Sequence, residues 1–257
     1  MAEKRKAPES DTKNRILDAA ERLYVEHGVD GVSLRPVTAA ARANLAAVNY
    51  HFGSRDNLLR AMLERRLDPL NAARDRLLDA CEARWGERLA CEHMLAALFV
   101  PALHQAREAG ESGYERMRFL GRVYSDASPL VTGLLKSRYD ATQRRFLAGF
   151  ARSLPELALP DLKLRLSFVM KAVAGVVAGS GLREVLVAFG RDGTDIPTAS
   201  SEIAILASFG NLMAGALMAP ARTDARLRIF DDVFSLSGPN TDRPEDVAAS
   251  LQMDAAE

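Results

Sequence analysis

The residues best suited to chemistry lie in segment 44–58, which reads Asn-Leu-Ala-Ala-Val-Asn-Tyr-His-Phe-Gly-Ser-Arg-Asp-Asn-Leu. Small side chains begin this segment, and Tyr50, His51 and Phe52 follow before Gly53 turns the chain. A helix with small side chains can press into a DNA groove, while hydroxyl and imidazole groups at its end can hydrogen-bond to phosphates. The pattern therefore predicts a recognition helix whose one aromatic residue, Phe52, faces a core.

Capping residues predict the short helices that would hold this segment. Gly28 stops the first helix in the position that favours glycine. Ser33 can cap the second helix, and Pro36 lies in its first turn, where a missing amide proton costs nothing. Asn44 can cap the third helix and Ser54 the fourth. These caps predict a compact helix-turn-helix unit.

Helical periodicity continues through the rest of the chain, and no alternation typical of strands occurs. The fourth helix is long and amphipathic, and Pro69 should kink or split it. Further helices are expected at 87–109, 114–124, 129–153, 160–189, 198–218 and 224–236. We expect an all-α fold of about nine helices, divided into a disordered basic tail at 1–11, a helix-turn-helix domain at 12–55, a helical bundle at 56–236 and a flexible acidic tail at 237–257.

The charge distribution contrasts a basic N-terminal part with an acidic C-terminal end. The 257 residues carry 34 Lys and Arg and 34 Asp and Glu, so the formal net charge is zero. Residues 1–66 hold twelve basic and nine acidic side chains, whereas residues 222–257 hold four and eight. The neutral total argues against indiscriminate nucleic-acid binding, and the contrast fits a DNA-facing head.

Neither the cysteines nor the apolar segments indicate an extracellular or membrane protein. Cys81 and Cys91 are the two cysteines, and both fall in helical patterns that predict reduced thiols. The N-terminus lacks the apolar stretch of a signal peptide. The longest apolar segment, 167–186, is interrupted by Lys171 and Arg183. We expect a cytoplasmic protein with no membrane partner.

Four short motifs resemble the DNA-binding domain of the TetR family of one-component transcriptional regulators. They are Arg-Ile-Leu-Asp-Ala-Ala at 15–20, Glu-His-Gly at 26–28, Ser-Leu-Arg at 33–35 and Asn-Tyr-His-Phe-Gly-Ser-Arg at 49–55. The third helix is also similar to that of a subgroup that includes fatty-acid-sensing, PsrA-like regulators. The resemblance implies a double-stranded, palindromic DNA operator, a homodimer and a small-molecule effector.

The resemblance and the chemistry of the residues together suggest the DNA contacts. Arg35 would lie near a base edge, where a guanidinium can bridge O6 and N7 of guanine. Tyr50 and His51 match positions that contact the DNA backbone, and Arg55 matches a phosphate-binding lysine. The apolar residues 45–47 cannot donate hydrogen bonds from their side chains, so they would read groove shape or thymine methyl groups. The expected DNA-binding residues are Ser33, Arg35, Asn44, Leu45, Ala47, Asn49, Tyr50, His51 and Arg55.

The turn after the second helix departs from the family pattern. The family usually has glycine at this turn, where the aligned residue is Arg42. A non-glycine residue in a left-handed turn costs on the order of 1 kcal/mol. Either the turn differs slightly, or Arg42 accepts the strain and adds a phosphate contact.

The middle helices supply apolar side chains that are candidates for an effector site. Met and Phe together form an adaptable wall suited to a long apolar ligand, although each residue could equally be core. The candidates are Phe99, Leu103, Met117, Leu120, Tyr124, Phe146, Phe150 and Phe168. Residues 115–152 resemble the ligand domain of PsrA-like regulators, which implies a fatty acid or acyl-CoA. Arg118, Arg122, Arg144 or Arg145 could receive its carboxylate or phosphate, or could simply lie on a solvated face.

Small residues on the last two long helices predict a close contact between helices. The candidates for dimerisation are Gly175, Gly179, Ala207, Gly210 and Ala214. In the TetR family these two helices build a four-helix dimer interface, which the resemblance implies here. A tight contact within one chain is the alternative. A dimer would present two heads to the two half-sites of an operator.

These features predict a ligand-responsive transcriptional regulator, of the repressor kind. A fatty acid or acyl-CoA would release the protein from its operator or alter its binding to the operator. A regulator of the same type that senses an unrelated aromatic or drug-like effector is the alternative. A helical metal-dependent enzyme is a remote alternative, because His93 and His104 lie on nearly the same helical face but no Glu-x-x-His pair accompanies them. We expect no catalytic residue, no metal and no cofactor.

Overall fold

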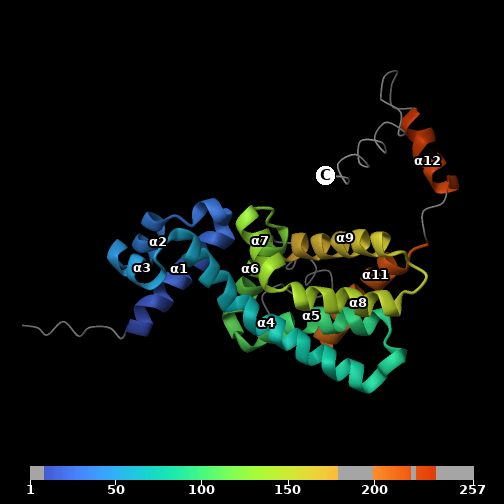
Figure 1. Cartoon of the computed structure of the whole chain (residues 1–257), viewed down its shortest axis with the longest axis horizontal. Coiled ribbons are helices and arrows are strands. Elements are labelled where there is room, and N and C mark those ends of the chain that lie inside the picture. The colour runs from blue at the N-terminus through green and yellow to red at the C-terminus, as the bar shows by residue number, and fades with distance from the viewer. Residues whose placement is uncertain (1–8, 179–198, 221–223, 236–257) are drawn as a thin grey trace, which may run out of the picture. The chain divides into compact units, whose positions relative to one another are not determined.

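The computed structural model describes residues 9–178, 199–220 and 224–235, and its regular structure within these ranges is helical (Figure 1). This confirms the all-α prediction. The predicted basic tail at 1–11 overlaps the described residues only at 9–11, which are helical and not disordered, and the predicted tail at 237–257 lies outside the described residues. The described helices are α1 (Glu9–Gly31), α2 (Leu34–Ala41), α3 (Leu45–Phe52), α4 (Arg55–Trp85), α5 (Cys91–Glu108), α6 (Gly113–Ser125), α7 (Pro129–Arg138), α8 (Asp140–Ser153), α9 (Leu159–Ala178), α11 (Ala199–Met218) and α12 (Asp224–Ser235), with 3-10 turns at Gly86–Arg88 and Gly110–Ser112.

The caps of the short N-terminal helices follow the sequence with one exception. The Oδ1 atom of Asn44 accepts the amide proton of Ala47 at 2.8 Å, and the Oγ atom of Ser54 accepts that of Asn57 at 3.1 Å. Ser33 occupies the cap position of α2, but its side chain makes no capping hydrogen bond, so that part of the prediction is wrong. The backbone carbonyl of Ser33 accepts a hydrogen bond from the amide of Val37, so Ser33 begins α2 through its backbone and not through its side chain.

Gly28 interrupts the helical run of α1, as its sequence position predicts. Its backbone has φ 72° and ψ −162°, a conformation that a residue with a side chain adopts only under strain. A Cβ atom at Gly28 would also lie 2.5 Å from the Nη2 atom of Arg122 on α6. Glycine is therefore required here for the turn, and a larger residue would also displace the flexible end of Arg122.

Of the kink or split predicted at Pro69, the split does not occur, because helix α4 runs unbroken through the proline. One prediction about the long helices is wrong. The segment predicted as one helix at 129–153 is two helices, α7 and α8, which meet at Tyr139 with φ −111° and ψ 15°. The helix predicted at 160–189 is described only to Ala178.

The interior formed by the described residues 9–178 and 199–218 contains two apolar clusters. The first joins α1–α3 to the beginning of α4, to α6 and to α7, and it ends on α4 at Leu70. The second joins the end of α4, from Leu78, to α5, α8, α9 and α11. Between them on α4 lie Asn71 and Arg74, the buried polar and charged side chains of the described residues. The shared helix α4 thus connects the N-terminal head to the bundle, which we call the body.

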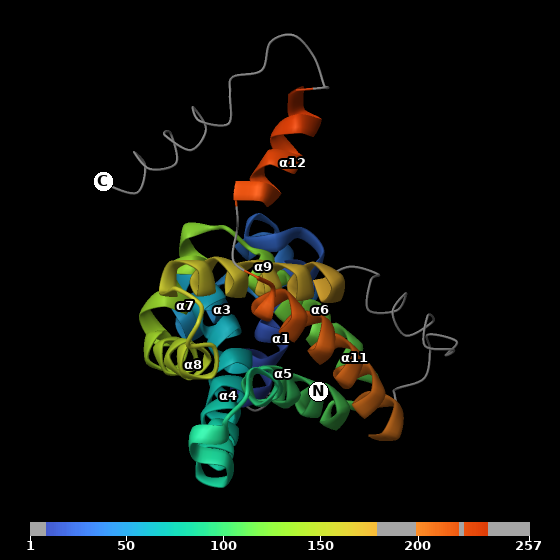
Figure 2. The same cartoon turned by 90° about the vertical axis from the view of Figure 1, so that its right-hand side faces the viewer.

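Helices α6 and α9 approach closely at a glycine. A Cβ atom at Gly121 would lie 2.4 Å from the backbone nitrogen of Ala178, so the two helices could not pack this way around a larger residue. Figure 2 shows α11 beside α9 on the same side of the body.

Helix α12 belongs to a second compact unit, residues 219–257. No helix among the described residues is long and apolar enough to cross a membrane.

Candidate DNA-binding site and effector-binding body

The inner side of α3 is fixed by apolar packing against α1 and α2. Val48 is fully buried and Phe52 nearly so, and both belong to the cluster that contains Ile16. Leu23 and Leu34 pack against the same cluster. This confirms the prediction that these aromatic and aliphatic residues face inward. The opposite side of α3 is therefore directed to solvent.

The outer side of α2 and α3 presents several of the residues predicted to contact DNA, whereas Ala47 is half-buried and packs against the first apolar cluster. Arg35 and Asn49 are exposed, Leu45 is 50% exposed, and Tyr50 is 75% exposed. His51 is half-buried, and its ring lies edge-on to that of Tyr50 with ring centroids 5.2 Å apart. Exposed aromatic and guanidinium groups beside small side chains give this face the chemistry for contacts with both phosphates and bases.

Two of the predicted DNA-binding residues also have structural roles, of which sequence reasoning missed that of Arg55. Asn44 uses its side-chain oxygen as the predicted cap of α3, which leaves its amide group available. Arg55 donates from Nε to the carbonyl of Val32 at 2.7 Å, and from Nη2 to the carbonyl of Val29. Arg55 therefore ties the start of α4 to the loop before α2, and its Nη1 atom lies 3.7 Å from Asp56. Nothing in the pattern of charges around Arg55 indicates this clamp.

The turn between α2 and α3 is left-handed at Arg42. Arg42 has φ 49° and ψ 45° and is the only non-glycine residue with positive φ among the described residues. The amide of Arg42 bonds to the carbonyl of Ala39, and that of Ala43 to the carbonyl of Thr38, which is the Schellman arrangement. Arg42 thus accepts the strain, and its exposed side chain lies immediately before the recognition helix.

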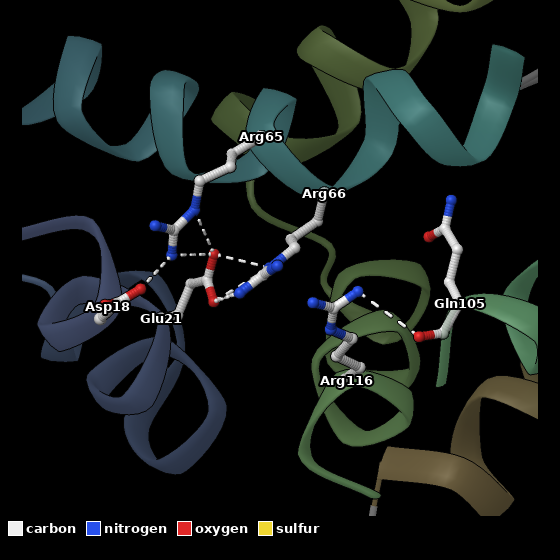
Figure 3. A network of polar contacts seen from close by, with 6 residues as sticks. All are labelled: Asp18, Glu21, Arg65, Arg66, Gln105 and Arg116. Carbon is white, nitrogen blue, oxygen red and sulfur yellow. Dashed lines mark hydrogen bonds and ion pairs between the residues drawn. The ribbon is translucent and has the colours of Figure 1, made fainter. Parts of the chain in front are cut away.

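A network of ion pairs joins the head to the body (Figure 3). Glu21 on α1 accepts hydrogen bonds from two arginines of α4, Arg65 at 2.9 Å and Arg66 at 2.8 Å. Arg65 also reaches Asp18 at 2.8 Å. Nearby, Arg116 on α6 donates to the carbonyl of Gln105 on α5, and burial, followed by the charge of Arg66, lowers its pKa. One carboxylate of α1, Glu21, is thus shared by two arginines of α4.

A second contact joins α1 to the end of α6. The hydroxyl of Tyr24 donates to Oδ2 of Asp126 at 3.0 Å, while Oδ1 of Asp126 accepts the amide proton of Ser128 at 2.8 Å. Burial, reinforced by the charge of Asp126, holds the pKa of Tyr24 far above its ordinary value. The phenol therefore stays protonated and can serve only as a donor to this carboxylate.

The structure does not bring the eight predicted ligand-lining residues into one site. Phe146 and Phe150 are buried in the second apolar cluster, whereas Leu120 belongs to the first. The half-buried members are Phe99, Leu103, Met117 and Tyr124. Phe168 is 67% exposed on α9, so the prediction that it lines the interior is wrong.

Three of the four arginines proposed for an anionic group already pair with acids. Arg118 pairs with Glu115, Arg144 pairs with Asp140, and Arg145 lies 2.7 Å from Glu82. The hydrogen bond from Arg145 holds the pKa of Glu82 below its ordinary range. The fourth, Arg122, lies against Gly28.

The sequence reasoning missed Arg74, a buried arginine on α4, because nothing in the helical pattern separates it from its solvated neighbours.

The residues predicted for dimerisation divide between the surface and the interior. Gly175 and Gly210 have open space where a Cβ atom would lie. Ala214 is buried in the chain's own second cluster, so its prediction as a contact between two chains is wrong. The position of Gly179 and the side chain of Ala207 lie outside the described residues. The outer faces of α9 and α11 also expose Leu164, Phe168 and Leu212.

His93 and the two cysteines are engaged in packing. Nδ1 of His93 accepts the amide proton of Ala90 at 3.0 Å, and its ring stacks on Trp85 with centroids 4.2 Å apart. Among the described residues no three His, Cys, Asp or Glu side chains are grouped as metal ligands would be. Cys81 and Cys91 are buried free thiols, and burial raises the pKa of Cys91 to about 12.

A surface cavity of about 400 Å³ lies at the end of α4 and includes none of the predicted ligand residues. It is lined by Glu82, Gly86, Glu87, Leu89 and Arg152.

The fold and the two faces of α3 define a helix-turn-helix protein with a helical body. Comparison with protein families agrees in both parts. Residues 16–62 match the family of bacterial regulatory proteins of the tetR type, and residues 96–203 match the tetracyclin repressor-like C-terminal domain. The chain belongs to the TetR family of transcriptional regulators, whose members are not enzymes.

Individual relatives resemble the chain over shorter stretches. The nicotine-responsive repressor HdnoR of Paenarthrobacter nicotinovorans is 35% identical over 72 residues, which cover 28% of this chain and 37% of that protein. The regulator SrpR of Pseudomonas putida is 36% identical over 70 residues, 27% of this chain and 33% of that protein. The chain thus matches about a third of the length of these relatives.

Solved structures resemble the chain over a larger share. SmeT in complex with triclosan is 26% identical, with a TM-score of 0.45 over 77% of this chain and 90% of that one. The fatty acid degradation regulator FadR from Bacillus halodurans is 17% identical, with a TM-score of 0.46 over 84% and 99%.

Proposed function

We propose that the chain is a ligand-responsive transcriptional regulator that binds a palindromic operator as a homodimer. The observation that carries this proposal is the division of the α2–α3 unit into two faces. Val48 and Phe52 are buried, so Arg35, Asn49 and Tyr50 must face outward together with the small residues of α3. This is the arrangement with which a recognition helix enters the major groove. Exposed Arg42 adds a cation at the edge of that face.

A homodimer through α9 and α11 is supported by what those helices expose. Leu164, Phe168 and Leu212 are large apolar residues in contact with solvent in one chain. Gly175 and Gly210 on the same helices leave room for a second pair of helices. Burial of such a surface against a second copy is favourable, and a twofold pair of heads matches the symmetry of a palindromic operator.

The proposed effector is a small apolar molecule, a fatty acid or acyl-CoA, that binds in the body. Its effect would pass through α4, which contributes Leu70 to the first apolar cluster and Leu78 to the second. A shift of α4 in two linked chains changes the separation of their heads. The effector acts only through its different affinities for the two states, so it releases DNA if it favours the state that does not fit.

Selection from a random pool of double-stranded DNA tests the regulator directly. The purified full chain is expected to enrich a sequence with two inverted half-sites about one helical turn apart, or a multiple of that spacing. Recovery of no common sequence contradicts the proposal. Addition of dodecanoate, dodecanoyl-CoA or triclosan to the selected complex then separates the fatty-acid version from the aromatic or drug-like alternative, because the true class lowers or alters DNA binding.

A further inference from the structure

The interior of the body holds a charged side chain that has no acidic partner among the described residues. Arg74 on α4 is 5% exposed. The ion pairs of the described part of the chain involve other arginines, and none includes Arg74. A buried charge without a counterion is costly, and buried charges in proteins are ordinarily paired. The chain therefore holds a cation in place that a bound anion would neutralise.

The hydrogen bonds of Arg74 orient its guanidinium without using all of it. Nε donates to the carbonyl of Leu98 on α5 at 2.9 Å. Nη1 donates to the hydroxyl of Tyr124 on α6 at 2.6 Å and to Oδ1 of Asn71 at 3.3 Å. No hydrogen bond within the described residues uses Nη2. Three neutral acceptors from three helices thus hold the group, and one of its nitrogen atoms keeps two donors available.

The hydroxyl of Tyr124 supplies a further donor beside the guanidinium. Because this hydroxyl accepts a hydrogen bond from Arg74, its own O–H group remains available to donate to a second group. The guanidinium also lies over the Tyr124 ring, with its carbon 5.5 Å from the ring centroid, which fixes both groups together. An N–H donor and an O–H donor side by side match the two oxygens of a carboxylate or of a phosphate.

The surroundings of Arg74 are apolar on two sides. Arg74 lies on α4 between Leu70, the last residue there of the first apolar cluster, and Leu78, the first of the second. Half-buried Phe99 packs against the second cluster, and half-buried Met117 against the first. The apolar part of an acidic molecule held at Arg74 would therefore meet apolar side chains in either direction.

We infer that Arg74 and Tyr124 receive the anionic group of an otherwise apolar effector, through a carboxylate or a phosphate. The inference rests on the proposed function, in which the body binds an effector, and it adds the chemistry that selects one. The anion would accept hydrogen bonds from Nη2 of Arg74 and from the hydroxyl of Tyr124. The apolar part of the effector would lie between the two clusters. A neutral apolar molecule would leave the buried charge unpaired.

Calorimetric titration of the full chain with three twelve-carbon probes tests the inference. Dodecanoate and dodecyl phosphate carry the two anionic groups, and dodecanol is neutral. Both anions, or one of them, should bind at least about tenfold more tightly than dodecanol, and the tighter anion identifies the group. Arg74→Gln should weaken the anion by roughly ten- to a hundredfold and leave dodecanol unchanged, because it removes charge-assisted hydrogen bonds.

Arg144→Gln is the matched control, because Arg144 is 73% exposed and pairs with Asp140 on the same helix. Its affinities should equal those of the unmodified chain. If Arg74→Gln does not fold, Arg74→Lys and Tyr124→Phe replace it, and each should weaken the anions selectively. Equal binding of the three probes, no binding of either anion, or an anion preference that survives these changes overturns the inference. DNA binding by the same preparations is measured in parallel, so a failure here is distinguished from a failure of the proposed regulator.

Discussion

The hydroxyl of Tyr24 in the head lies 3.0 Å from Oδ2 of Asp126 at the end of α6, 102 positions later in the chain. Tyr124, which holds Arg74, lies two residues before Asp126. Two hydrogen bonds, Arg74 to Tyr124 and Tyr24 to Asp126, therefore connect the buried cation of the body to the helix on which the DNA-binding unit packs. A displacement of the end of α6 would alter both.

Tyr24→Phe should lower the free energy of unfolding by about 1–2 kcal/mol, because one buried hydrogen bond is lost and little volume changes. Asp126→Asn, which keeps an acceptor oxygen, should cost less. In a double-mutant cycle of Tyr24→Phe with Asp126→Ala, which removes the acceptor, the two changes should couple by about 1 kcal/mol in urea unfolding. Thr142→Ala on α8 is the control and should be additive with Tyr24→Phe. Full additivity of Tyr24→Phe and Asp126→Ala would refute the role of this contact.

Glu21→Gln should lower the free energy of unfolding by about 2–3 kcal/mol, because it removes the negative charge that two arginines of α4 share in a mostly buried position. Circular dichroism during urea unfolding measures this effect. Asp11→Asn is the matched control, since Asp11 forms an exposed pair with Arg15 of the kind that contributes little. Equal effects of the two changes would show that the network of Figure 3 does not hold α1 to α4.

Arg42→Gly should change stability and DNA binding in opposite directions. Glycine removes the strain of the left-handed turn, about 1–2 kcal/mol, and adds about 0.5–1 kcal/mol of backbone entropy cost, so the thermal midpoint should stay equal or rise. Loss of a phosphate contact in each head should weaken operator binding and reduce its salt dependence by about one charge per chain, which is about two per bound dimer.

Arg42→Lys is the control for this prediction, because it keeps both the charge and the strained backbone. Fluorescence anisotropy at several salt concentrations provides the DNA measurement. An unchanged salt dependence in Arg42→Gly would mean that Arg42 does not contact DNA. A lower thermal midpoint would mean that the turn needs a feature of arginine other than its backbone.

Acidification should reduce stability through Asp68 and Glu82. Hydrogen bonds from Arg138 to Asp68 and from Arg145 to Glu82 hold the pKa values of both carboxyls below their ordinary range in the folded chain. Such groups stabilise the fold fully above their unfolded pKa, about 4, and lose the contribution as the pH falls through the folded value. Urea midpoints at pH 7, 5, 4 and 3 should therefore decline below about pH 4. Asp68→Asn should lower the pH 7 midpoint and flatten this decline, and a parallel decline in both proteins would contradict the assignment.

The sequence predicts the head well because local chemistry determines it. Gly28, Asn44 and Ser54 end or begin their helices where capping rules place them, and the spacing of Val48 and Phe52 determines which side of α3 is buried. The left-handed turn at Arg42 is one of the two alternatives that the sequence leaves open, since the family resemblance marks the position.

The body is predicted less well because contacts distant in sequence decide its details. No glycine or proline marks the break between α7 and α8 at Tyr139 in the sequence. The hydroxyl of Tyr139 instead donates a hydrogen bond of 2.7 Å to Asp68 on α4, which holds the residue in place. Helix α4 accommodates Pro69 within packing on both sides. The exposure of Phe168 and the burial of Arg74 depend on which neighbours the fold supplies, and periodicity alone treats both residues as ordinary members of a helix.

The most direct test of the regulator is the affinity of head variants for the selected operator. Arg35→Ala and Tyr50→Ala change exposed side chains, so their thermal midpoints should stay close to that of the unmodified chain. Each should weaken operator binding at least about tenfold in fluorescence anisotropy, and Arg35→Ala should also relax the preference for one base pair. Arg144→Ala, a change of an exposed arginine of the body, should alter the affinity less than about twofold. If Arg35→Ala and Tyr50→Ala bind the operator as tightly as the unmodified chain, the outer face of α2 and α3 is not the DNA-binding site, and the proposed function is wrong.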